Sequence, residues 1–423
     1  MKTFVLVAFI LLYILMFIKP KNRIFFVWSV AILFVIFGVL PVNKLIETVN
    51  WNVLLMISGT MIIVYYFIDS QMPVFLADIL LAKSKNVRSI IILMSLFAGI
   101  ISAFIDNVAT VLMVAPVGIA ICKKIRISPV GMILSIAVSS NLQGAATLVG
   151  DTTSIMLGDY ANMSFTDFFW LKGHLGIFFG VELGALATIP LMMFIFRKEK
   201  ATISSTHTAT ISSFIPTVML LIMISALIIA SLFPNAPEMT NGIICVVLGI
   251  ITILIDSMCK QNKGRINQAL KNIDYETLLL LGGLFIVIGG LINVGIINDF
   301  ANLIVQLGKD NSFLLYTIIV WGSVVISAFI DNIPYMATML PVITIVTNTL
   351  GVEPYIFYFG LLSGATLGGN LTPIGASANI AAIGILKKEG YHISIKEFMR
   401  IGAPYTLCAV LVGYVYFWVV YNI

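Results

Sequence analysis

The chain has 423 residues, a length that would make about three ordinary soluble domains. Its composition excludes that reading, because 60% of the residues are hydrophobic, 10% are charged and the mean hydropathy is +1.07, whereas soluble domains carry about 25% charged residues. The formal net charge of +5 is spread in short groups between apolar runs, which indicates membrane topology and excludes a nucleic-acid-binding face. The sequence therefore predicts an all-α polytopic membrane protein.

Apolar segments that could cross a bilayer follow one another along nearly the whole chain. Two are too long for one crossing: a straight helix over 89–121 would measure about 50 Å, whereas a bilayer core spans about 30 Å. Segment 89–121 contains the polar pair Asp106-Asn107, and segment 312–346 contains Asp331-Asn332. Each is predicted to turn back at this pair, as a re-entrant hairpin or as two short crossings. The remaining segments predict about ten transmembrane helices: 3–18, 24–40, 51–69, 129–158, 173–196, 212–233, 241–258, 276–297, 354–386 and 399–420.

Positive residues orient these segments, because Lys and Arg accumulate in cytoplasmic loops. If the N-terminus lies outside, all but four of the 24 Lys and Arg residues fall in inner loops, and the four are Lys2, Lys44, Lys172 and Lys309. The inner loops include a Ser/Thr-rich linker at 201–211. This pattern predicts a multi-pass protein of the cell (inner) membrane with both termini outside.

The hexapeptide Ser-Ala-Phe-Ile-Asp-Asn occurs at 102–107 and again at 327–332. The same offset, without a gap, pairs Pro116 with Pro341, Gly144 with Gly369, Thr147 with Thr372 and Gly150 with Gly375. Each half, 1–200 and 212–423, then holds five single spans and one segment that turns back. Because five is odd, the second half is predicted to be inverted, an architecture typical of secondary transporters with a substrate site at the repeat interface.

Polar residues within apolar sequence gather at the two turns and in the helices that follow them, 129–158 and 354–386. Glycines and Pro373 interrupt both helices, and broken helices are tolerated in a membrane only where the freed backbone is buried in protein or lines a cavity. Freed carbonyls, amides and carboxylates suit a cation such as Na⁺, and half-helix N-termini suit an anion. The candidate substrate- and ion-binding residues are Asp106, Asn107, Thr110, Asn141, Thr147, Gly150, Asp151, Thr152, Asp331, Asn332, Asn370, Thr372, Gly375, Ser377 and Asn379.

An Asp-Asn pair in a turn ordinarily caps the following helix. An ionisable residue at mid-membrane is costly and is functional by default, and here the pair is duplicated. We therefore predict Asp106, Asn107, Asp331 and Asn332 as Na⁺ ligands. Glu182 lies in the middle of a span without a counterpart in the second half, and the sequence leaves open whether it carries a proton or pairs with a neighbour. The four Cys and three His residues are dispersed and predict neither a disulfide framework nor a His/Cys metal site.

With these residues, the sequence resembles the ion transporter superfamily, in particular the ArsB/NhaD permeases and the related citrate-transporter-like and P-protein-like permeases. The matching stretches are SAFIDNVATVLMVAP at 102–116, SAFIDNIPYMATMLP at 327–341 and GGNLTPIGASANI at 368–380. The resemblance covers nearly the whole chain. It implies two re-entrant hairpins, two broken helices, a scaffold and a mobile transport domain that moves as an elevator, in a homodimer. It also implies a coupling ion, Na⁺ or H⁺, between hairpin tips and broken helices, and no other cofactor.

Two departures from related patterns bear on the substrate. P-protein-like members usually read GDPPN in the first half, whereas this chain reads Gly-Asp-Thr-Thr-Ser at 150–154. For the sodium-coupled dicarboxylate branch, the resemblance implies Ser-Asn-Thr at the hairpin tips, whereas in this chain Asp106 and Asp331 place carboxylates at these positions. Two additional negative charges favour cations or protons and oppose a multiply charged anion unless ions bind first.

The leading hypothesis is a Na⁺- or H⁺-coupled secondary transporter for a small anion or a metalloid acid, of the arsenite/antimonite or carboxylate class. The alternative is a Na⁺/H⁺ antiporter. The chain lacks the GxGD motif of intramembrane aspartyl proteases and the GxxxxGK[ST] loop of ATPases, so we do not expect an enzyme. A passive channel would fit the composition but would not predict inverted halves with broken helices. The expected partners are the bilayer, the substrate and, if the solute is arsenite, a separate ATPase subunit.

Overall fold

The computed structural model describes residues 1–199, 201–202, 210–233, 236–260, 264–308 and 311–421, and residues 203–209 of the predicted linker 201–211 lie outside these ranges. The described chain is almost entirely helical, with one small hairpin of strands β1 (Trp170–Leu171) and β2 (His174–Leu175). Within these ranges, seven helices are long and apolar enough to cross a membrane. The predicted all-α membrane class is confirmed.

Twenty α-helices carry the described fold. The first half contains α1 (Lys2–Ile18), α2 (Arg23–Ile36), α3 (Leu45–Thr48), α4 (Trp51–Asp69), α5 (Met72–Lys83), α6 (Val87–Ser102), α7 (Asn107–Lys124), α8 (Val130–Gly144), α9 (Thr152–Tyr160) and α10 (Ile177–Ile195). The second half contains α11 (Ile215–Ala230), α12 (Thr240–Lys260), α13 (Gly264–Lys271), α14 (Tyr275–Asn293), α15 (Ile296–Gly308), α16 (Ser312–Ser327), α17 (Asn332–Leu350), α18 (Tyr355–Gly368), α19 (Ser377–Lys388) and α20 (Ile395–Tyr421).

The repeat offset of the sequence reappears in the helix starts. The first residues of α6, α7, α8 and α9 are separated from those of α16, α17, α18 and α19 by the same offset as the two hexapeptides. Their capping residues follow it too: the side chain of Asn86 accepts a hydrogen bond from Ser89 N at the start of α6, and that of Asn311 accepts one from Leu314 N at the start of α16. A side-chain oxygen at this position satisfies a backbone donor that the first helical turn leaves free. The repeat therefore encodes where these helices begin.

The two long segments and the two interrupted helices take related forms. Segment 89–121 is formed by α6 and α7, joined at 103–106, and segment 312–346 by α16 and α17, joined at 328–331. The helix predicted over 129–158 is divided into α8 and α9, and the helix over 354–386 into α18 and α19. In each half the first hairpin helix packs along the helix before the break, α6 on α8 and α16 on α18.

Several elements were not predicted. Helices α5, α13 and α15 occupy stretches that the sequence interpretation left as loops, and α5 has only 12 residues, too short to cross a bilayer core of about 30 Å. The predicted span 24–40 is wrong at its end, because the helix stops at Ile36. The predicted span 173–196 is wrong at its start, because His174 lies in β2 and α10 begins at Ile177.

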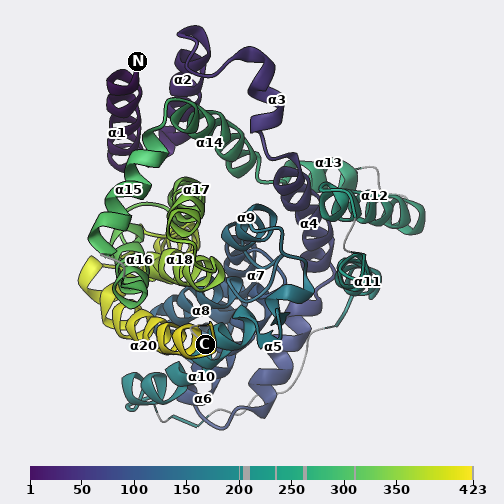
Figure 1. Ribbon diagram of the computed structural model, residues 1–423. Helices are drawn as coiled ribbons and strands as arrows, with labels where there is room; N and C mark the ends of the chain where they lie inside the picture. Colours follow the sequence, from purple (N-terminus) through teal and green to yellow (C-terminus); the bar gives the residue numbers. More distant parts are fainter. Residues whose placement is uncertain (200, 203–209, 234–235, 261–263, 309–310, 422–423) are drawn as a thin grey trace.

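The helices pack as two groups, which Figure 1 shows as an arc around a denser centre. The scaffold group comprises α1, α2, α4, α11, α12 and α14, whose contacts are mainly with one another. The core group comprises the hairpins α6–α7 and α16–α17, the interrupted helices α8–α9 and α18–α19, and the paired helices α10 and α20. Helices α4 and α14 of the scaffold group contact α9 and α17 of the core group.

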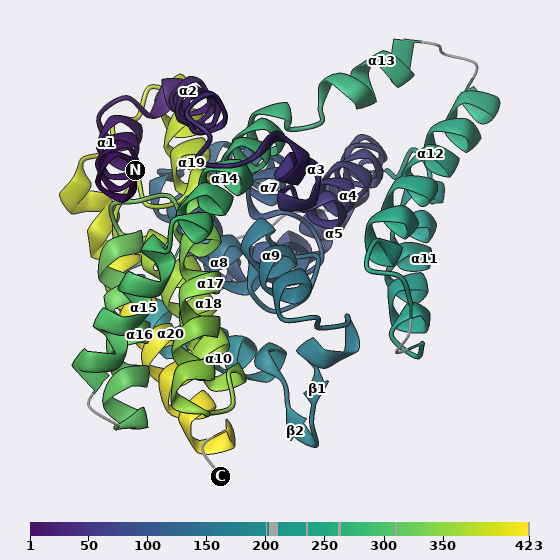
Figure 2. The same cartoon turned by 45° about the horizontal axis from the view of Figure 1, so that its top comes forward.

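Apart from the Arg23–Asp331 pair, the ion pairs in the described chain join segments that the predicted span count places on the same side of the membrane. Those on the predicted outer side are Lys2–Asp299 (2.6 Å) and Lys172–Glu353 (2.9 Å), and those on the inner side are Lys123–Glu389 (2.5 Å) and Arg265 with both Asp69 and Asp256. Figure 2 shows the β1–β2 hairpin and α13 at opposite ends of the molecule, as their predicted sides require.

Candidate functional site

The two hairpin tips hold their aspartates in the same way. One carboxylate oxygen of Asp106 accepts hydrogen bonds from Val108 N (3.0 Å) and Ala109 N (3.1 Å), and one of Asp331 accepts a bond from Ile333 N (3.1 Å). Both aspartates therefore cap the second helix of their hairpin. In each case the second carboxylate oxygen takes no part in the cap, so it is available to bind another partner.

Each hairpin tip is attached to the break of the interrupted helix beside it. The hydroxyl of Thr147 donates to the carbonyl of Ala103, and at the equivalent place in the second half that of Thr372 donates to the carbonyl of Ala328. Gly150 approaches the same turn so closely that an added Cβ would lie 2.7 Å from the carbonyl oxygen of Ala103. A side chain there would displace the backbone, and the equivalent Gly375 is under the same constraint.

The structure shows what replaces the Asn of the GDPPN pattern at 150–154. The Ser154 hydroxyl donates to Gly144 O at 3.2 Å, and at the equivalent position the Asn379 amide donates to Gly369 O at 3.1 Å. Ser154 thus replaces the missing Asn in tying the second helix across the break. The neighbouring Thr153 hydroxyl bonds to the Asp151 carboxylate at 2.9 Å.

A buried amide network joins the two interrupted helices at the centre of the core group. The Asn141 amide donates to Thr366 O (2.6 Å) and to the Asn370 side chain (3.1 Å), and the Asn370 amide donates to Val138 O (3.0 Å). The Asn107 amide donates to the Asn141 side chain at 2.8 Å. Because buried polar groups must be paired, this network fixes the interrupted helices relative to each other and to one tip.

The second tip also contacts the scaffold group. The Arg23 guanidinium at the start of α2 lies 2.9 Å from the Asp331 carboxylate, and the Ser377 hydroxyl donates to the same oxygen at 3.1 Å. The two charged side chains are only 19% and 16% exposed, so the ion pair is well shielded from water. No equivalent cation pairs with Asp106 in the part of the chain that the structure describes.

A cavity of about 200 Å³ lies between the tips, the first break and the scaffold group. Ten of its thirteen lining residues are polar or charged, and they include acidic side chains from both groups of helices. The lining residues are Arg23, Met61, Asp106, Asn107, Val108, Asp151, Thr152, Asp274, Glu276, Thr277, Asn332, Ile333 and Ser377. Four carboxylates therefore face one guanidinium that Asp331 already pairs, and such a space attracts cations.

The predicted site residues divide into two sets. Those that line the cavity are Asp106, Asn107, Asp151, Thr152, Asn332 and Ser377, with Asp331 beside it through Arg23 and Ser377. Those buried behind the cavity are Thr110, Asn141, Thr147, Gly150, Asn370, Thr372, Gly375 and Asn379. Glu182 on α10 belongs to neither set. The second set forms the buried frame of the site, and the first set faces the cavity.

Three charged residues of the site were not predicted. Arg23 was counted with the cytoplasmic loop charges, and Asp274 and Glu276 stand where an apolar span was expected to start. All three belong to the ends of scaffold helices, where charges ordinarily lie at the membrane interface. A signal was nevertheless present for Asp274, which caps α14 and lies almost at the repeat offset from Asn50, the cap of α4.

A second polar contact between the two groups lies at the far end of α9. The Asp159 carboxylate accepts hydrogen bonds from the side-chain amides of both Asn50 and Asn52 at the start of α4, the latter at 2.6 Å. The side-chain carbonyl of each Asn also accepts a hydrogen bond, that of Asn50 from Val53 N and that of Asn52 from Gly242 N. We call these three side chains the Asp159 clamp.

Residues 13–362 match the family described as CitMHS, citrate transporter. The chain belongs to this citrate transporter family. An uncharacterized transporter of Mycobacterium tuberculosis (strain H37Rv) is 31% identical over 379 residues, which cover 88% of this chain and 87% of the relative. The mouse P protein is 26% identical over 462 residues, which cover 88% of this chain and 54% of the P protein. The resemblance to ion transporter superfamily permeases is confirmed.

Solved transporter structures share the fold of this citrate transporter family member. The YdaH transporter of Alcanivorax borkumensis superposes with a TM-score of 0.61 at 13% identity, over 89% of this chain and 87% of that one. MtrF of Neisseria gonorrhoeae, which represents a class of antimetabolite efflux pumps, gives 0.56 at 12% identity, over 86% and 80%. At these identities the likeness shows the fold alone. Together with the family, it makes the chain a multi-pass membrane transporter.

Proposed function

We propose that this transporter moves a small carboxylate of the citrate class together with Na⁺ or H⁺. The observation that carries the proposal is the cavity in which Arg23 of the scaffold group faces carboxylates at the hairpin tip and the first break. A guanidinium recognises a carboxylate by parallel hydrogen bonds. A neutral metalloid acid such as arsenite needs no cationic partner, so Arg23 favours the carboxylate class. A separate ATPase subunit would be expected only for an arsenite transporter.

Cation binding must precede the anion in this scheme. Asp106 and Asp151 would repel a free tricarboxylate until Na⁺ or protons neutralise them. In the described residues no cluster of three or more His, Cys, Asp or Glu suits a metal ion, so a Na⁺ ion would also use neutral oxygens. Asn107, Thr152, Asn332 and the backbone carbonyls of the breaks supply them, with Asp331 released as the substrate takes Arg23.

The two helix groups suit an elevator-type movement of the core group against the scaffold group. The core group is held together by the Asn141 network and by the Thr147 and Thr372 bonds, whereas a small number of polar contacts tie it to the scaffold. These include the Arg23–Asp331 pair and the Asp159 clamp. The inverted halves, 1–200 and 212–423, and a homodimer joined through the scaffold complete the proposal.

A Na⁺/H⁺ antiporter is the second candidate, because the lining carboxylates outnumber the guanidinium. Proteoliposomes that report internal pH after a Na⁺ jump separate the two functions. We expect little pH change after the Na⁺ jump alone, and uptake of labelled citrate or succinate driven by a Na⁺ or H⁺ gradient, with arsenite inactive. A full Na⁺-driven pH change without any solute would establish exchange, and a response to arsenite alone would move the chain to the metalloid class.

The proposed orientation places both termini outside the inner membrane. A cysteine introduced at Lys124 should then react with a membrane-impermeant maleimide only from the cytoplasmic side, and one at Lys172 only from outside. The two variants are matched, since each replaces one lysine in a cysteine-free background. The reverse pattern would overturn the orientation while leaving the fold intact.

A further inference from the structure

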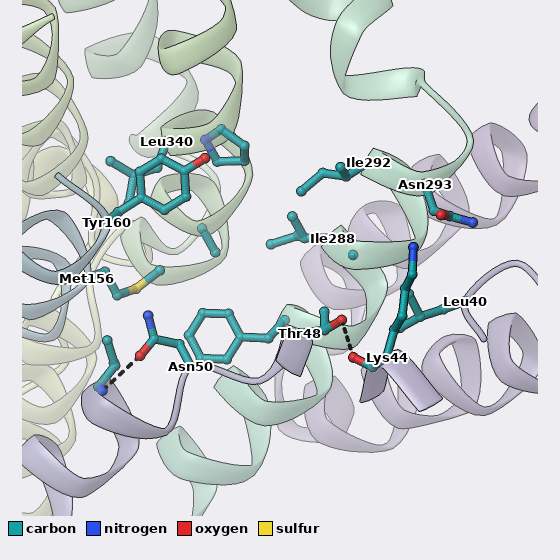
Figure 3. Close-up of a pocket in the computed structure, with 15 residues that line it drawn as sticks. Leu40, Lys44, Thr48, Asn50, Met156, Tyr160, Ile288, Ile292, Asn293 and Leu340 are labelled. Carbon is teal, nitrogen blue, oxygen red and sulfur yellow. Dashed lines mark hydrogen bonds between the residues drawn. The ribbon is translucent and has the colours of Figure 1, made fainter. Parts of the chain in front are cut away.

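A second cavity, of about 330 Å³, lies between the same two groups of helices (Figure 3). Its walls are largely apolar, with Met156 of α9, Phe285, Ile288 and Ile292 of α14 and Leu340 of α17 among them. Cavities of about 300–1,000 Å³ are the usual size of small-molecule sites. An apolar space of this kind gains little from water and favours a hydrocarbon.

The two cavities lie along one seam. Helices α4, α9, α14 and α17 contribute to both cavities. They line the polar cavity at Met61, Thr152, Thr277 and Ile333, and the apolar cavity at Val53, Met156, Phe285 and Ala337, among others. The predicted topology puts the polar cavity toward the cytoplasm and the apolar cavity toward the outside. A multiply charged substrate that suits the polar cavity does not suit the apolar one, because Lys44 is the one charged residue on its largely apolar walls.

One charged side chain lines the apolar cavity, that of Lys44. Figure 3 shows it extending along the rim toward Asn293. Nearby polar groups are already engaged: the Thr48 hydroxyl donates to Lys44 O (2.7 Å), and the Asn293 amide donates to Val39 O (2.9 Å). Across the described ranges, no ion pair or side-chain hydrogen bond involves the Lys44 ammonium, so the rim presents an unpaired positive charge above an apolar space.

We propose that this cavity binds a single-chain anionic amphiphile, a free fatty acid whose carboxylate pairs with Lys44 and whose chain lies against Phe285 and Ile288. A volume of about 330 Å³ lies at the small end of the range for small-molecule sites, so we assign the cavity one short acyl chain and not the two chains of a phospholipid.

An occupant would touch both groups of helices, since Met156 and Leu340 belong to the core group and Ile288 to the scaffold group. A ligand shifts a conformational equilibrium only by its difference in affinity for the two states. A fatty acid held in this seam therefore favours the arrangement described here, in which the adjacent Asp159 clamp is closed, and slows transport.

The test uses the full-length protein in phosphatidylcholine nanodiscs with a dodecanoate that carries a photoactivatable diazirine near its chain end. We expect cross-links on peptides that contain Met156, Ile288 or Leu340, displaced by unlabelled dodecanoate and only weakly by dodecanol. Lys44→Gln should weaken dodecanoate binding about 3–5-fold, the upper range for an exposed ion pair. The matched variant Lys172→Gln, an exposed lysine of the β-hairpin, should bind as wild type.

Ile288→Trp should fill the cavity and abolish the cross-links, and if this variant fails to fold, the Lys44→Gln comparison decides alone. Cross-links spread over the lipid-facing surfaces of α11 and α12, or equal binding by Lys44→Gln and wild type, would overturn the site. A phospholipid that co-purifies with wild type and is lost in Lys44→Gln would overturn the single-chain assignment. Transport measured in proteoliposomes of the same phosphatidylcholine, without fatty acid, tests the proposed function separately.

Discussion

The two hairpin tips share one hexapeptide and one backbone frame, yet they meet different surroundings. Asp331 pairs with Arg23 and Ser377, whereas Asp106 faces the cavity beside Asp151, without a cation partner among the described residues. The repeat supplies both tips alike, so the difference comes from the scaffold group, which brings a guanidinium to one tip. Duplicated residues thus build the frame of the site, and unduplicated residues distinguish its two ends.

The largest effect is expected from Asp331→Asn. Asn still caps α17 but leaves the Arg23 guanidinium unpaired, and losing one partner of a shielded charge pair costs about 2–5 kcal/mol. We expect coupled flux in proteoliposomes to fall about 100-fold. The control Asp299→Asn removes an exposed carboxylate paired with Lys2 and should transport as wild type. Unchanged flux in Asp331→Asn would reduce this tip to a helix cap.

Asp106→Asn is expected to act differently, which sharpens the comparison of the tips. It removes one negative charge from the cavity and strands no cation. The half-saturating Na⁺ or H⁺ concentration should rise about tenfold, equivalent to about 1.4 kcal/mol, with the maximal rate within about twofold of wild type. Titration of the coupling ion at saturating substrate measures this. A loss of maximal rate as complete as in Asp331→Asn would make the two tips equivalent.

The frame itself is expected to be symmetric. Thr147→Val and Thr372→Val each remove one buried hydroxyl bond to a hairpin carbonyl and should each lower the free energy of unfolding by about 1 kcal/mol. The two losses should agree within about 0.5 kcal/mol. Thr349→Val, on the exposed face of α17, is the control and should cost less. Unequal losses at Thr147 and Thr372, measured by unfolding in detergent, would contradict an equivalent frame.

The smallest effect is expected where the frame departs from symmetry. Ser154 makes one bond across its break, whereas Asn379 bonds to both Gly369 O and Thr372 O. Ser154→Ala should therefore cost about 0.5 kcal/mol and Asn379→Ala about 1 kcal/mol. The same unfolding measurement compares them. A larger loss at Ser154 would mean that the first break depends on this bond more than the second does on its pair.

Local features of the sequence predicted the turns and the breaks. Polar pairs, glycines and prolines inside apolar sequence are conspicuous, and their repetition at one offset indicates a common structure. The same features could not distinguish the roles of Asn141 and Asn107, because in the sequence a residue that faces the cavity and a residue of the frame both appear as polar residues within apolar runs. Only the structure shows that Asn141 uses its amide to bind Thr366 and Asn370, while Asn107 also reaches the cavity.

The scaffold side of the site was not predictable in this way. Arg23, Asp274 and Glu276 occupy helix ends, where a residue that serves the site and a residue that anchors a helix at the interface look alike. Helix α15 was missed for a related reason, since it has only 13 residues and polar residues interrupt its apolar ones. The roles of the three charged residues and the position of α15 depend on where α2 and α14 lie in space, which is a tertiary property.

The bonds from Thr147 and Thr372 to the hairpin carbonyls have a consequence for vectorial transport. They join tips and breaks into one piece, so under the proposed movement a bound solute keeps its core-group neighbours throughout the cycle. The difference in affinity between the two faces of the membrane then depends on Arg23 and the scaffold carboxylates alone. Substitutions in the scaffold could reverse the preferred direction of release while every repeated motif stayed unchanged.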